Sequence, residues 1–404
     1  MADLSVEYVG LKMKNPLLAA SATETKDAKT MKKAVDAGFG GVVVKSLYGN
    51  SAKVARRWHR PRFQLLHWDP KTTDPLKAPD GFILYSIEQG SQFNYEEWFE
   101  DVNKAKKLIG NDGVVIGSIM AGSFEEWDEI LTKYMPGTEM DALEIDLSCP
   151  HMKEVHAEYG VALGADPVHA GKLVKFVKER MPAGMPLIPK LTPQTANMVA
   201  VAKACEENGA DAICAHNRMM ALDIDIEKAA PSVWPCYGGW GGPWMLPYMQ
   251  MWISKLAPAV KIPITCTNGV WKWQDIISTI MAGATTVQSC TAILVKGFGA
   301  VQDWLTNVNK WMDEKGYKSF DEIRGIALKN MIPVGEIPRN QPGVYAVVDP
   351  EKCTACGWCE KICLYEAPKV NGECAEIDPD KCDGCGMCWQ VCPLKAIEMT
   401  KPAC

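Results

Sequence analysis

The sequence predicts an α/β fold, a (β/α)8 barrel followed by a small α+β domain. Apolar runs alternate with amphipathic stretches from residue 14 to about residue 312, and these runs contain few polar residues. Such runs are typical of parallel strands that are buried on both faces. Eight strand–helix units over about 300 residues is the number that closes a barrel. The end of the chain instead repeats a cysteine pattern, which indicates a separate domain. An open, doubly wound sheet is the alternative architecture for the first part.

The expected strands cover residues 16–20, 41–46, 114–119, 142–146, 187–191, 212–215, 264–268 and 286–289, and the helices between them include residues 27–37, 95–108, 166–180, 195–208 and 273–282. Polar side chains stand at the strand ends, at Ser21, Lys45, Ser46, Asp146, Lys190, Asn217, Asn268 and Thr291. Catalytic groups of a barrel gather at the C-terminal ends of its strands, so this pattern predicts an active-site face. Ser21 and Asp146 also fit the simpler role of a helix N-cap.

We expect the barrel to cover residues 1–330, a linker rich in Pro and Gly to cover 331–346, and the cysteine-rich domain to cover 347–404. Two long insertions interrupt the barrel pattern, at residues 48 to about 78 and at 151–163. Such loops are either binding lids or packed surface excursions. Residues 234–244 combine glycines, which let backbone N–H groups approach a phosphate, with tryptophans that suit a planar ligand or a subunit contact.

The composition argues against several classes of function. A chain of 404 residues with 47% hydrophobic content can bury a large core, and its net charge of −6 gives no case for nucleic acid or anionic membranes as partners. No apolar run is long enough for a transmembrane helix, and the N-terminal residues lack a signal-peptide pattern. We therefore expect a cytoplasmic protein whose scattered barrel cysteines are free thiols.

The most specific motif is a doubled cysteine run of the CxxCxxCxxxC type, whose spacing suits a cubane cluster. In two-cluster ferredoxins the fourth cysteine of each run ligates the other cluster. We therefore expect two [4Fe–4S] clusters. Their ligands would be Cys353, Cys356, Cys359 and Cys392 for the first cluster, and Cys363, Cys382, Cys385 and Cys388 for the second. Zinc is the alternative, but a zinc site has no use for the third cysteine of each run.

Clusters of this type carry single electrons and perform no bond chemistry on a small substrate themselves. They need a partner group that can pass electrons on to such a substrate. A flavin exchanges single electrons with a cluster and a hydride with a substrate. The cysteine runs therefore predict a flavin in the barrel.

With barrel and cysteine runs together, the chain resembles the dihydroorotate dehydrogenase superfamily, and most closely the FMN and iron–sulfur half of dihydropyrimidine dehydrogenase. The resemblance covers nearly the whole chain. It is carried by NPLLAAS at residues 15–21, VKS at 44–46, SIM at 118–120, LSCPH at 147–151, KLTP at 190–193, Asn217, YGG at 237–239, TNG at 267–269, VQSCT at 287–291 and the two cysteine runs.

The resemblance implies a role for each matching position. Ala20 and Ser21 would lie against FMN, and Lys45 would act catalytically near its reactive edge. Lys190 would stabilise negative charge on the reduced flavin, because a cation at that position favours the anionic form. Asn217 would bind the substrate. The FMN phosphate would lie among Gly241, Gly242, Asn268, Gly269, Cys290 and Thr291.

The chain departs from the family pattern at the proton donor. Where dihydropyrimidine dehydrogenase has a cysteine in the loop after the fourth strand, this chain has Leu163, which cannot transfer a proton. Nearby replacements are His156, Tyr159 and Glu158. Of these, His156 has the ordinary pKa that best suits proton transfer near neutrality, although it could equally be a solvent-facing loop residue.

The substrate-binding positions also differ from the family pattern. Asp146 replaces an Asn, and Arg218 follows Asn217 where relatives have Thr or Ser. Arginine binds carboxylates through two parallel hydrogen bonds, and Asp146 would meet a donor on the substrate or pair with Arg218. Glu88 fits a position near the pocket mouth. These residues favour an unsaturated ring or enoyl compound that carries a carboxylate over uracil or thymine.

Three functions remain open from the sequence. The leading prediction is an oxidoreductase that reduces or forms a C=C bond. The second is an electron-transfer subunit whose barrel has lost its own chemistry, or a true dihydropyrimidine dehydrogenase subunit. The third, a flavin-free aldolase-like barrel, matches the lysine and glycine pattern poorly. No GxGxxG follows a strand. Electrons would therefore come from a ferredoxin or from a partner flavoprotein that oxidises NAD(P)H, in a homodimer or a hetero-oligomer.

Overall fold

The structure is a computed structural model, and it describes residues 2–69, 71, 81–148, 164–232, 234–337 and 343–400. The chain divides into two compact units, Met1–Asn330 and Met331–Cys404. Each unit is described by itself. In the described part of the chain, no helix combines the length and apolar character needed to cross a membrane.

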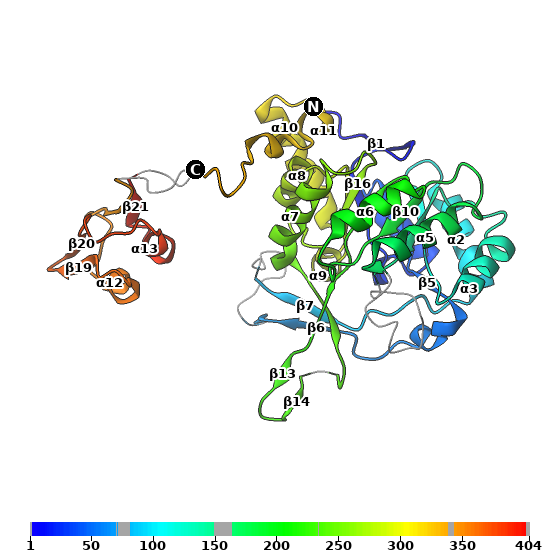
Figure 1. The fold of residues 1–404 in the computed structure, drawn as a ribbon, viewed down its shortest axis with the longest axis horizontal. Helices are drawn as coiled ribbons and strands as arrows, with labels where there is room; N and C mark the ends of the chain where they lie inside the picture. Colours follow the sequence, from blue (N-terminus) through cyan, green and yellow to red (C-terminus); the bar gives the residue numbers. More distant parts are fainter. Residues whose placement is uncertain are drawn as a thin grey trace. The chain divides into compact units, whose positions relative to one another are not determined.

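The first unit is a closed parallel barrel (Figure 1). Its strands are β3 (Leu17–Ala19), β4 (Gly41–Val43), β8 (Val114–Met120), β9 (Ala142–Asp146), β10 (Leu187–Lys190), β11 (Ile213–Ala215), β16 (Ile264–Thr267) and β17 (Thr286–Ser289). Each strand pairs in parallel with its neighbours in this order, and β17 pairs with β3 to close the ring. Closure confirms the predicted barrel and excludes the open sheet. Each expected strand range overlaps one of these strands.

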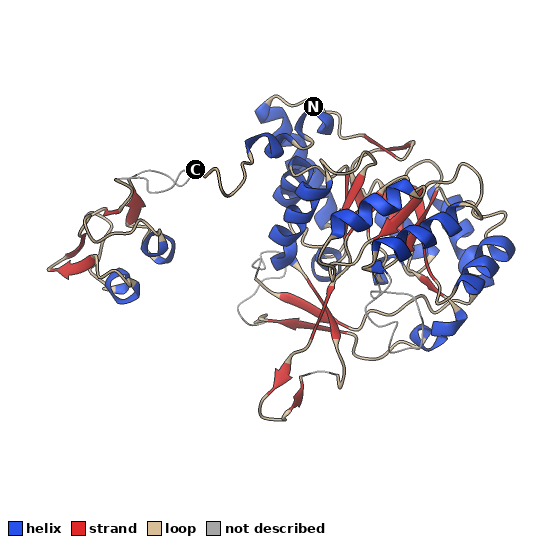
Figure 2. Ribbon diagram, viewed as in Figure 1, coloured by secondary structure: helices blue, strands red, loops and turns tan. Residues whose placement is uncertain are grey.

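The helices surround the barrel and bury one apolar face against it (Figure 2). They are α1 (Ala28–Asp36), α2 (Tyr95–Ile109), α3 (Phe124–Glu129), α5 (Pro167–Lys178), α6 (Met198–Glu207), α7 (Leu246–Leu256), α8 (Trp273–Met281), α9 (Thr291–Lys296), α10 (Ala300–Lys315) and α11 (Phe320–Ile323). Side-chain caps begin several of them: Asp27 accepts from the Thr30 N–H, and Asn94 accepts from the Glu97 N–H. Caps fix where each βα loop ends, and therefore where the loop residues lie.

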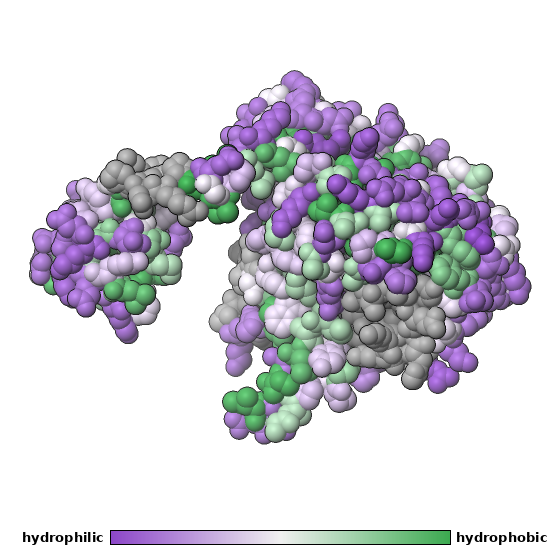
Figure 3. Space-filling model, viewed as in Figure 1, coloured by the Kyte–Doolittle hydropathy of each residue, from purple (hydrophilic) through white to green (hydrophobic). Residues whose placement is uncertain are grey.

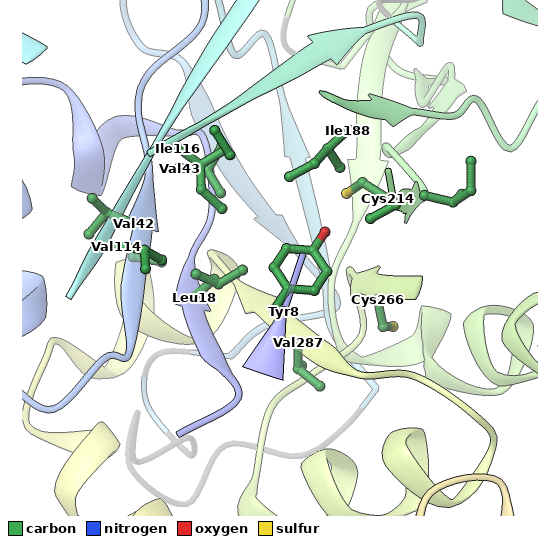
Figure 4. Close-up of a cluster of buried hydrophobic side chains, with 14 of the residues drawn as sticks. Tyr8, Leu18, Val42, Val43, Val114, Ile116, Ile188, Cys214, Cys266 and Val287 are labelled. Carbon is green, nitrogen blue, oxygen red and sulfur yellow. The ribbon is translucent and has the colours of Figure 1, made fainter. Parts of the chain in front are cut away.

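One end of the barrel interior is filled by Tyr8, from the N-terminal hairpin of β1 (Val6–Tyr8) and β2 (Leu11–Met13). Figure 4 shows its ring among apolar side chains of the barrel strands, including Leu18, Ile188 and Val287. The Thr265 hydroxyl donates to the Tyr8 hydroxyl over 2.7 Å, which satisfies a buried polar group. The interior is therefore packed at this end, so a ligand site has to lie at the other end of the strands.

A four-stranded antiparallel sheet is added to the barrel and was not predicted. It contains β6 (Phe63–Leu66), β7 (Ile83–Ser86), β15 (Gly238–Gly241) and β12 (Met219–Ala221), in the order β12-β15-β7-β6. Strand β6 of the first long insertion pairs with β7, and β7 pairs with β15 of the glycine-rich segment, with Gly239 opposite Ser86. The described part of the insertion also contains a 3-10 helix at Asn50–Arg56. The short strands β13 (Ile224–Asp225) and β14 (Ala230–Pro231) pair with each other and lie between β12 and β15 in the chain.

The hairpin of β13 and β14 carries apolar side chains on its surface. Leu222, Ile224 and Ile226 are all exposed, and Ile226 most of all at 83%. Figure 3 shows this apolar patch at the tip of the hairpin. The first unit also contains the short strand β5 (Leu47–Tyr48), which pairs with β8, and several short helices, among them a 3-10 helix at Thr23–Thr25 that follows β3.

The second unit is a small α+β domain built from two similar halves. Strand β18 (Ala346–Val348) pairs with β21 (Ile397–Met399), and β19 (Pro368–Asn371) pairs with β20 (Cys374–Ile377). The helices α12 (Trp358–Ile362) and α13 (Met387–Val391) lie within the two cysteine runs. Its fully buried apolar cluster is confined to Ala346, Cys359, Ala375 and Ile397. A core this small rarely stabilises a domain without a metal centre or disulfides.

Candidate active site

A cavity of about 840 Å³ lies at the C-terminal ends of the barrel strands. All predicted substrate-binding residues line it, as do all predicted cofactor-binding residues except Gly241. The residues that line it include Ala20, Ser21, Lys45, Glu88, Asp146, Lys190, Asn217, Arg218, Gly242, Asn268, Gly269, Gln288, Ser289, Cys290 and Thr291. Gly241 lies beside it, where an added Cβ would meet Arg218 and Asn268 at 3.1 Å.

Lys45 forms a buried ion pair with Glu88 at one side of the cavity. The backbone around Lys45 is fixed by two hydrogen bonds, from its N–H to the Thr25 carbonyl and from the Trp98 indole to its own carbonyl. Burial alone would raise the pKa of Glu88, but the charges of Lys45 and Arg218 outweigh that effect and lower it. Glu88 therefore remains a carboxylate at neutral pH.

Lys190 reaches the cavity from the end of β10 and pairs with Glu144 of the neighbouring strand β9. The Lys190 Nζ lies 3.3 Å from Glu144 Oε1, and the Gln288 amide donates to Glu144 Oε2 over 2.8 Å. Burial alone would lower the pKa of Lys190, but the negative charge of Glu144 outweighs it and raises the pKa. Lys190 is therefore a fixed positive charge.

The sequence analysis did not identify Glu144 or Gln288. Glu144 is fully buried in an otherwise apolar strand. An unpaired carboxylate at such a position is costly, so the residue itself predicts a buried cation nearby. Lys190 stands at the end of the next predicted strand, so the Lys190–Glu144 ion pair could have been predicted from the sequence.

Asp146 and Arg218 do not pair with each other in the described structure. Asp146 accepts hydrogen bonds from the backbone N–H of Ser148, over 2.8 Å, and from the Ser148 hydroxyl, which closes a tight turn at the end of β9. Arg218 donates to the Ser86 hydroxyl instead. Its guanidinium lies flat against β15, where a Cβ on Gly239 would stand 2.7 Å from it. One glycine of residues 234–244 thus makes room for Arg218.

Asn217 lies directly before Arg218, in the short connection between β11 and β12, and its hydrogen bonds fix that connection. The Asn217 side-chain oxygen accepts from the Arg218 N–H over 2.8 Å, and the Asn217 N–H donates to the Leu191 carbonyl. The predicted proton donors His156 and Tyr159, together with Glu158 and Leu163, lie outside the described residues. Lys45 is the predicted catalytic residue whose position is described.

In the second unit, two cavities each gather four of the eight patterned cysteines. One is lined by Cys353, Cys356, Cys359 and Cys392, and the other by Cys363, Cys382, Cys385 and Cys388. Each cavity thus takes three cysteines from one run and the last cysteine of the other run. Among the described residues, no three His, Cys, Asp or Glu side chains come close enough to bind a single metal ion. Four cysteines around each cavity, three from one run and one from the other, is the ligand pattern of two-cluster ferredoxins.

Comparison with known proteins agrees with this arrangement. A family model described as dihydroorotate dehydrogenase matches residues 89–312, more than half of the chain. The chain belongs to the dihydroorotate dehydrogenase family. A second model, the 4Fe-4S binding domain, matches residues 346–368 and 375–398.

Two relatives illustrate the range of this dihydroorotate dehydrogenase family. The catalytic subunit of dihydroorotate dehydrogenase B (NAD(+)) from Pyrococcus abyssi is 31% identical over 81% of this chain and 99% of its own length. The NAD-dependent dihydropyrimidine dehydrogenase subunit PreA from Escherichia coli K12 is 29% identical over 89% of this chain and 85% of its own length. This member of the family is an oxidoreductase that acts on CH–CH groups and uses FMN and two [4Fe–4S] clusters.

The described cavity fits the FMN that the family uses. Gln288 Oε1 and Ser289 Oγ are buried at its edge with no hydrogen-bond partner among the described residues, so the cavity offers polar atoms to a ligand. Gly242, Asn268 and Gly269 have φ values of 118°, 89° and 82°. At Gly269 a Cβ would stand 2.7 Å from the Leu246 backbone, so the loop accepts only glycine there.

The cysteine cavities likewise fit clusters. The Ala375 N–H donates to Cys353 Sγ over 3.4 Å, and the Ala396 N–H donates to Cys392 Sγ over 3.3 Å. Backbone hydrogen bonds from Ala375 and Ala355 lower the pKa of Cys353. Thiolates are the form that binds iron, so these N–H groups favour the ligand state.

Because the apolar core of the second unit is so small, we expect its fold to depend on iron. Anaerobic removal of iron with a chelator should unfold residues 343–400, while the barrel unit keeps its fold. Hydrogen exchange followed by peptide mass spectrometry would show this as loss of protection confined to β18–β21. Retained protection in the iron-free protein would contradict the prediction.

Proposed function

We propose that the chain reduces or forms a C=C bond in a small unsaturated compound that carries a carboxylate, with FMN in the barrel cavity and electrons passing through the two clusters. The observation that carries this proposal is the convergence of Lys45, Lys190 and Arg218 on one cavity. Two of these cations already have carboxylate partners in the protein, whereas Arg218 has a neutral hydroxyl as its hydrogen-bond partner. Arg218 is therefore the cation best placed to bind an anionic substrate.

In this proposal, the chain binds FMN with residues from five strand ends. Ala20 and Ser21 lie against the ring, and Lys190 balances negative charge on it. Gly242, Asn268, Gly269, Cys290 and Thr291 surround the phosphate, and Gly241 leaves room for Arg218 and Asn268. When bound, FMN supplies hydride transfer to or from the substrate and single-electron exchange with the clusters.

The substrate would lie between Arg218, Asn217 and the carboxylates Glu88 and Asp146. The guanidinium of Arg218 is held by Ser86 and by the flat surface of β15, so it is pre-oriented for a carboxylate. Asp146 and Glu88 would accept hydrogen bonds from donor groups of the substrate, and Arg218, whose charge also acts on Glu88, is the cation that would bind its carboxylate. A neutral pyrimidine ring gives Arg218 no such partner, and this favours a carboxylate-bearing ring or enoyl compound over uracil and thymine.

The proton of the reaction needs a separate group, for which we propose His156, with Tyr159 as its alternative. Lys45, held by Glu88, keeps a positive charge close to the reacting atoms. His156→Gln should lower the rate of substrate reduction by about 10²–10⁴-fold, the usual contribution of a general acid, while flavin content stays unchanged. Stopped-flow measurement of the flavin step would show it. A wild-type rate in His156→Gln, with a slow Tyr159→Phe variant, would assign the role to Tyr159.

The electrons would enter or leave through the cluster domain. We propose that each cysteine cavity ligates one [4Fe–4S] cluster through its four cysteines. The partner would be a ferredoxin or a flavoprotein subunit that oxidises NAD(P)H, in a hetero-oligomer. The relatives support this, since they are themselves named as subunits of NAD-dependent enzymes.

The decisive experiment is an anaerobic reoxidation assay. The purified chain is reduced, and recovery of the oxidised-flavin absorption is followed against unsaturated carboxylates, their methyl esters, cyclic enones and pyrimidines. Rapid reoxidation by an unsaturated carboxylate but not by its ester supports the proposal. Reoxidation by uracil or thymine would make the chain a dihydropyrimidine dehydrogenase subunit. If no compound reacts while an added ferredoxin or flavoprotein still exchanges electrons, the chain is an electron-transfer subunit.

A further inference from the structure

A buried carboxyl group lies directly behind the wall of the flavin cavity. Glu24 belongs to the 3-10 helix Thr23–Thr25, which follows β3 and the cavity-lining residues Ala20 to Ala22. Its side chain is 6% exposed, and its Oε1 has no hydrogen-bond partner among the described residues. Its Oε2 lies 3.8 Å from the Sγ of Cys290, whose own residue lines the cavity. A carboxyl group placed in this way is unexplained by packing alone.

The ammonium group of Lys45, which acts on Glu24, already has another carboxylate as its partner. Lys45 is the nearest ammonium group, and it forms its ion pair with Glu88. Glu88 also accepts from the Thr23 hydroxyl over 2.9 Å, so Thr23 connects the two carboxyl groups along the chain. The charge of Arg218 also acts on this cluster, but its guanidinium donates to Ser86, and the Arg62 guanidinium donates to the Thr23 hydroxyl over 3.4 Å. The cluster therefore contains two carboxyl groups, and Lys45 forms its ion pair with Glu88 and not with Glu24.

Ionisation of Glu24 would place an uncompensated charge in a buried position, which is unfavourable. Burial is the largest influence and raises the pKa of Glu24 to about 8, and the charge of Glu88 acts in the same direction. The hydrogen bond from Cys290 and the charge of Lys45 lower the pKa but do not cancel the effect of burial. The geometry and the charge balance thus agree that the neutral acid is the stable form near pH 7.

We propose that Glu24 is a proton-holding residue of the flavin pocket: its carboxyl group stays protonated in the resting enzyme, and its proton affinity follows the charge of the flavin beside it. The second half of this inference rests on the proposed placement of FMN in the cavity. With FMN bound, negative charge on the reduced flavin would raise the proton affinity of Glu24, so that above about pH 8 an ionised Glu24 would take up one proton from solvent and would release it when that charge is removed. Glu24 thereby limits the build-up of negative charge around Lys45 and Glu88.

The first test needs no flavin. In the flavin-free protein with its clusters in place, the protonated carboxyl C=O stretch of Glu24 should persist through pH 7 in the infrared spectrum and should be lost as the pH rises through about 8. It should be absent from Glu24→Gln. Glu100→Gln, which alters an exposed carboxyl group on α2, is the matched control and should leave this band unchanged. A spectrum of Glu24→Gln identical to wild type at pH 7 would overturn the proposal.

Stability provides an independent readout with a fixed sign. The pKa of Glu24 is raised in the folded state, so the folded protein binds more protons than the unfolded protein between about pH 4.5 and about pH 8. Wild type should therefore lose thermal stability relative to Glu24→Gln as the pH rises through this window, and the two should differ least below it. A difference in Tm that is independent of pH would contradict a protonated Glu24. If Glu24→Gln does not fold, Glu24→Met serves the same comparison.

The second test uses the flavin-loaded enzyme. Above pH 8 the flavin midpoint potential of wild type should fall more steeply with pH than that of Glu24→Gln, by one proton per flavin. Equal slopes in both proteins, with full flavin content, would overturn the coupling to the flavin. Failure of wild type to bind flavin would instead refute the proposed placement of FMN in the cavity. The infrared and stability tests of Glu24 do not depend on that placement.

Discussion

Lys190→Ala is expected to lower the free energy of unfolding by about 3–5 kcal/mol, the usual cost of removing one partner from a buried ion pair. Glu144, which is fully buried, would lose its ammonium partner and keep neutral hydrogen-bond partners such as the Gln288 amide. The unpaired carboxyl group would take up a proton in the folded state. The variant should therefore be least stable at high pH, since a raised folded-state pKa removes stability as the pH rises.

The same substitution should impair the flavin step even where the protein folds. Lys190 is the fixed cation proposed to balance negative charge on the flavin, so its loss should slow flavin reduction or weaken flavin retention. The double variant Lys190→Met with Glu144→Gln separates the two effects, because it removes both charges together. We expect urea unfolding of the double variant to return close to wild type while stopped-flow flavin reduction stays slow. Wild-type flavin content and reduction rate in Lys190→Ala would show that the assigned role is wrong.

Arg218→Gln is expected to raise KM for the carboxylate substrate about 10²–10³-fold, because two charge-assisted hydrogen bonds are lost together. Arg218→Lys should recover little of this loss, since an ammonium group cannot form the paired geometry. The value of kcat should change less than KM, because the carboxylate is bound equally in the ground state and the transition state.

The measurement compares each acid that reoxidises the flavin with its methyl ester. Wild type should prefer the acid strongly, and Arg218→Gln should treat both alike. Arg180→Gln is the matched control, because Arg180 lies just beyond α5 and pairs with Asp128. Equal losses on acid and ester would show that Arg218 stabilises the pocket and does not recognise the carboxylate.

Several features were determined by the sequence because their causes are local. Buried parallel strands such as Ala142–Asp146 are visible as apolar runs, since every side chain in them meets a helix or the barrel interior. The cysteine runs predicted two iron–sulfur clusters because ligand spacing is a short-range property of the chain. Lys45, Lys190, Asn217 and Arg218 follow strand ends, and parallel strands in one barrel bring their ends to one face.

Other features depended on contacts between distant segments. The sheet that joins β7 to β15 pairs residues about 150 positions apart, and β15 is so rich in glycine that it has no strand pattern of its own. Glycines in β15 make room for the side chains of Tyr85 and Arg218. From the sequence alone, the glycines of this segment had suggested a phosphate site. Glu24 had no motif at all. Its chemistry arises because the turn after β3 places it between Cys290 and the Lys45–Glu88 pair, and the burial that decides its protonation exists only in the folded chain.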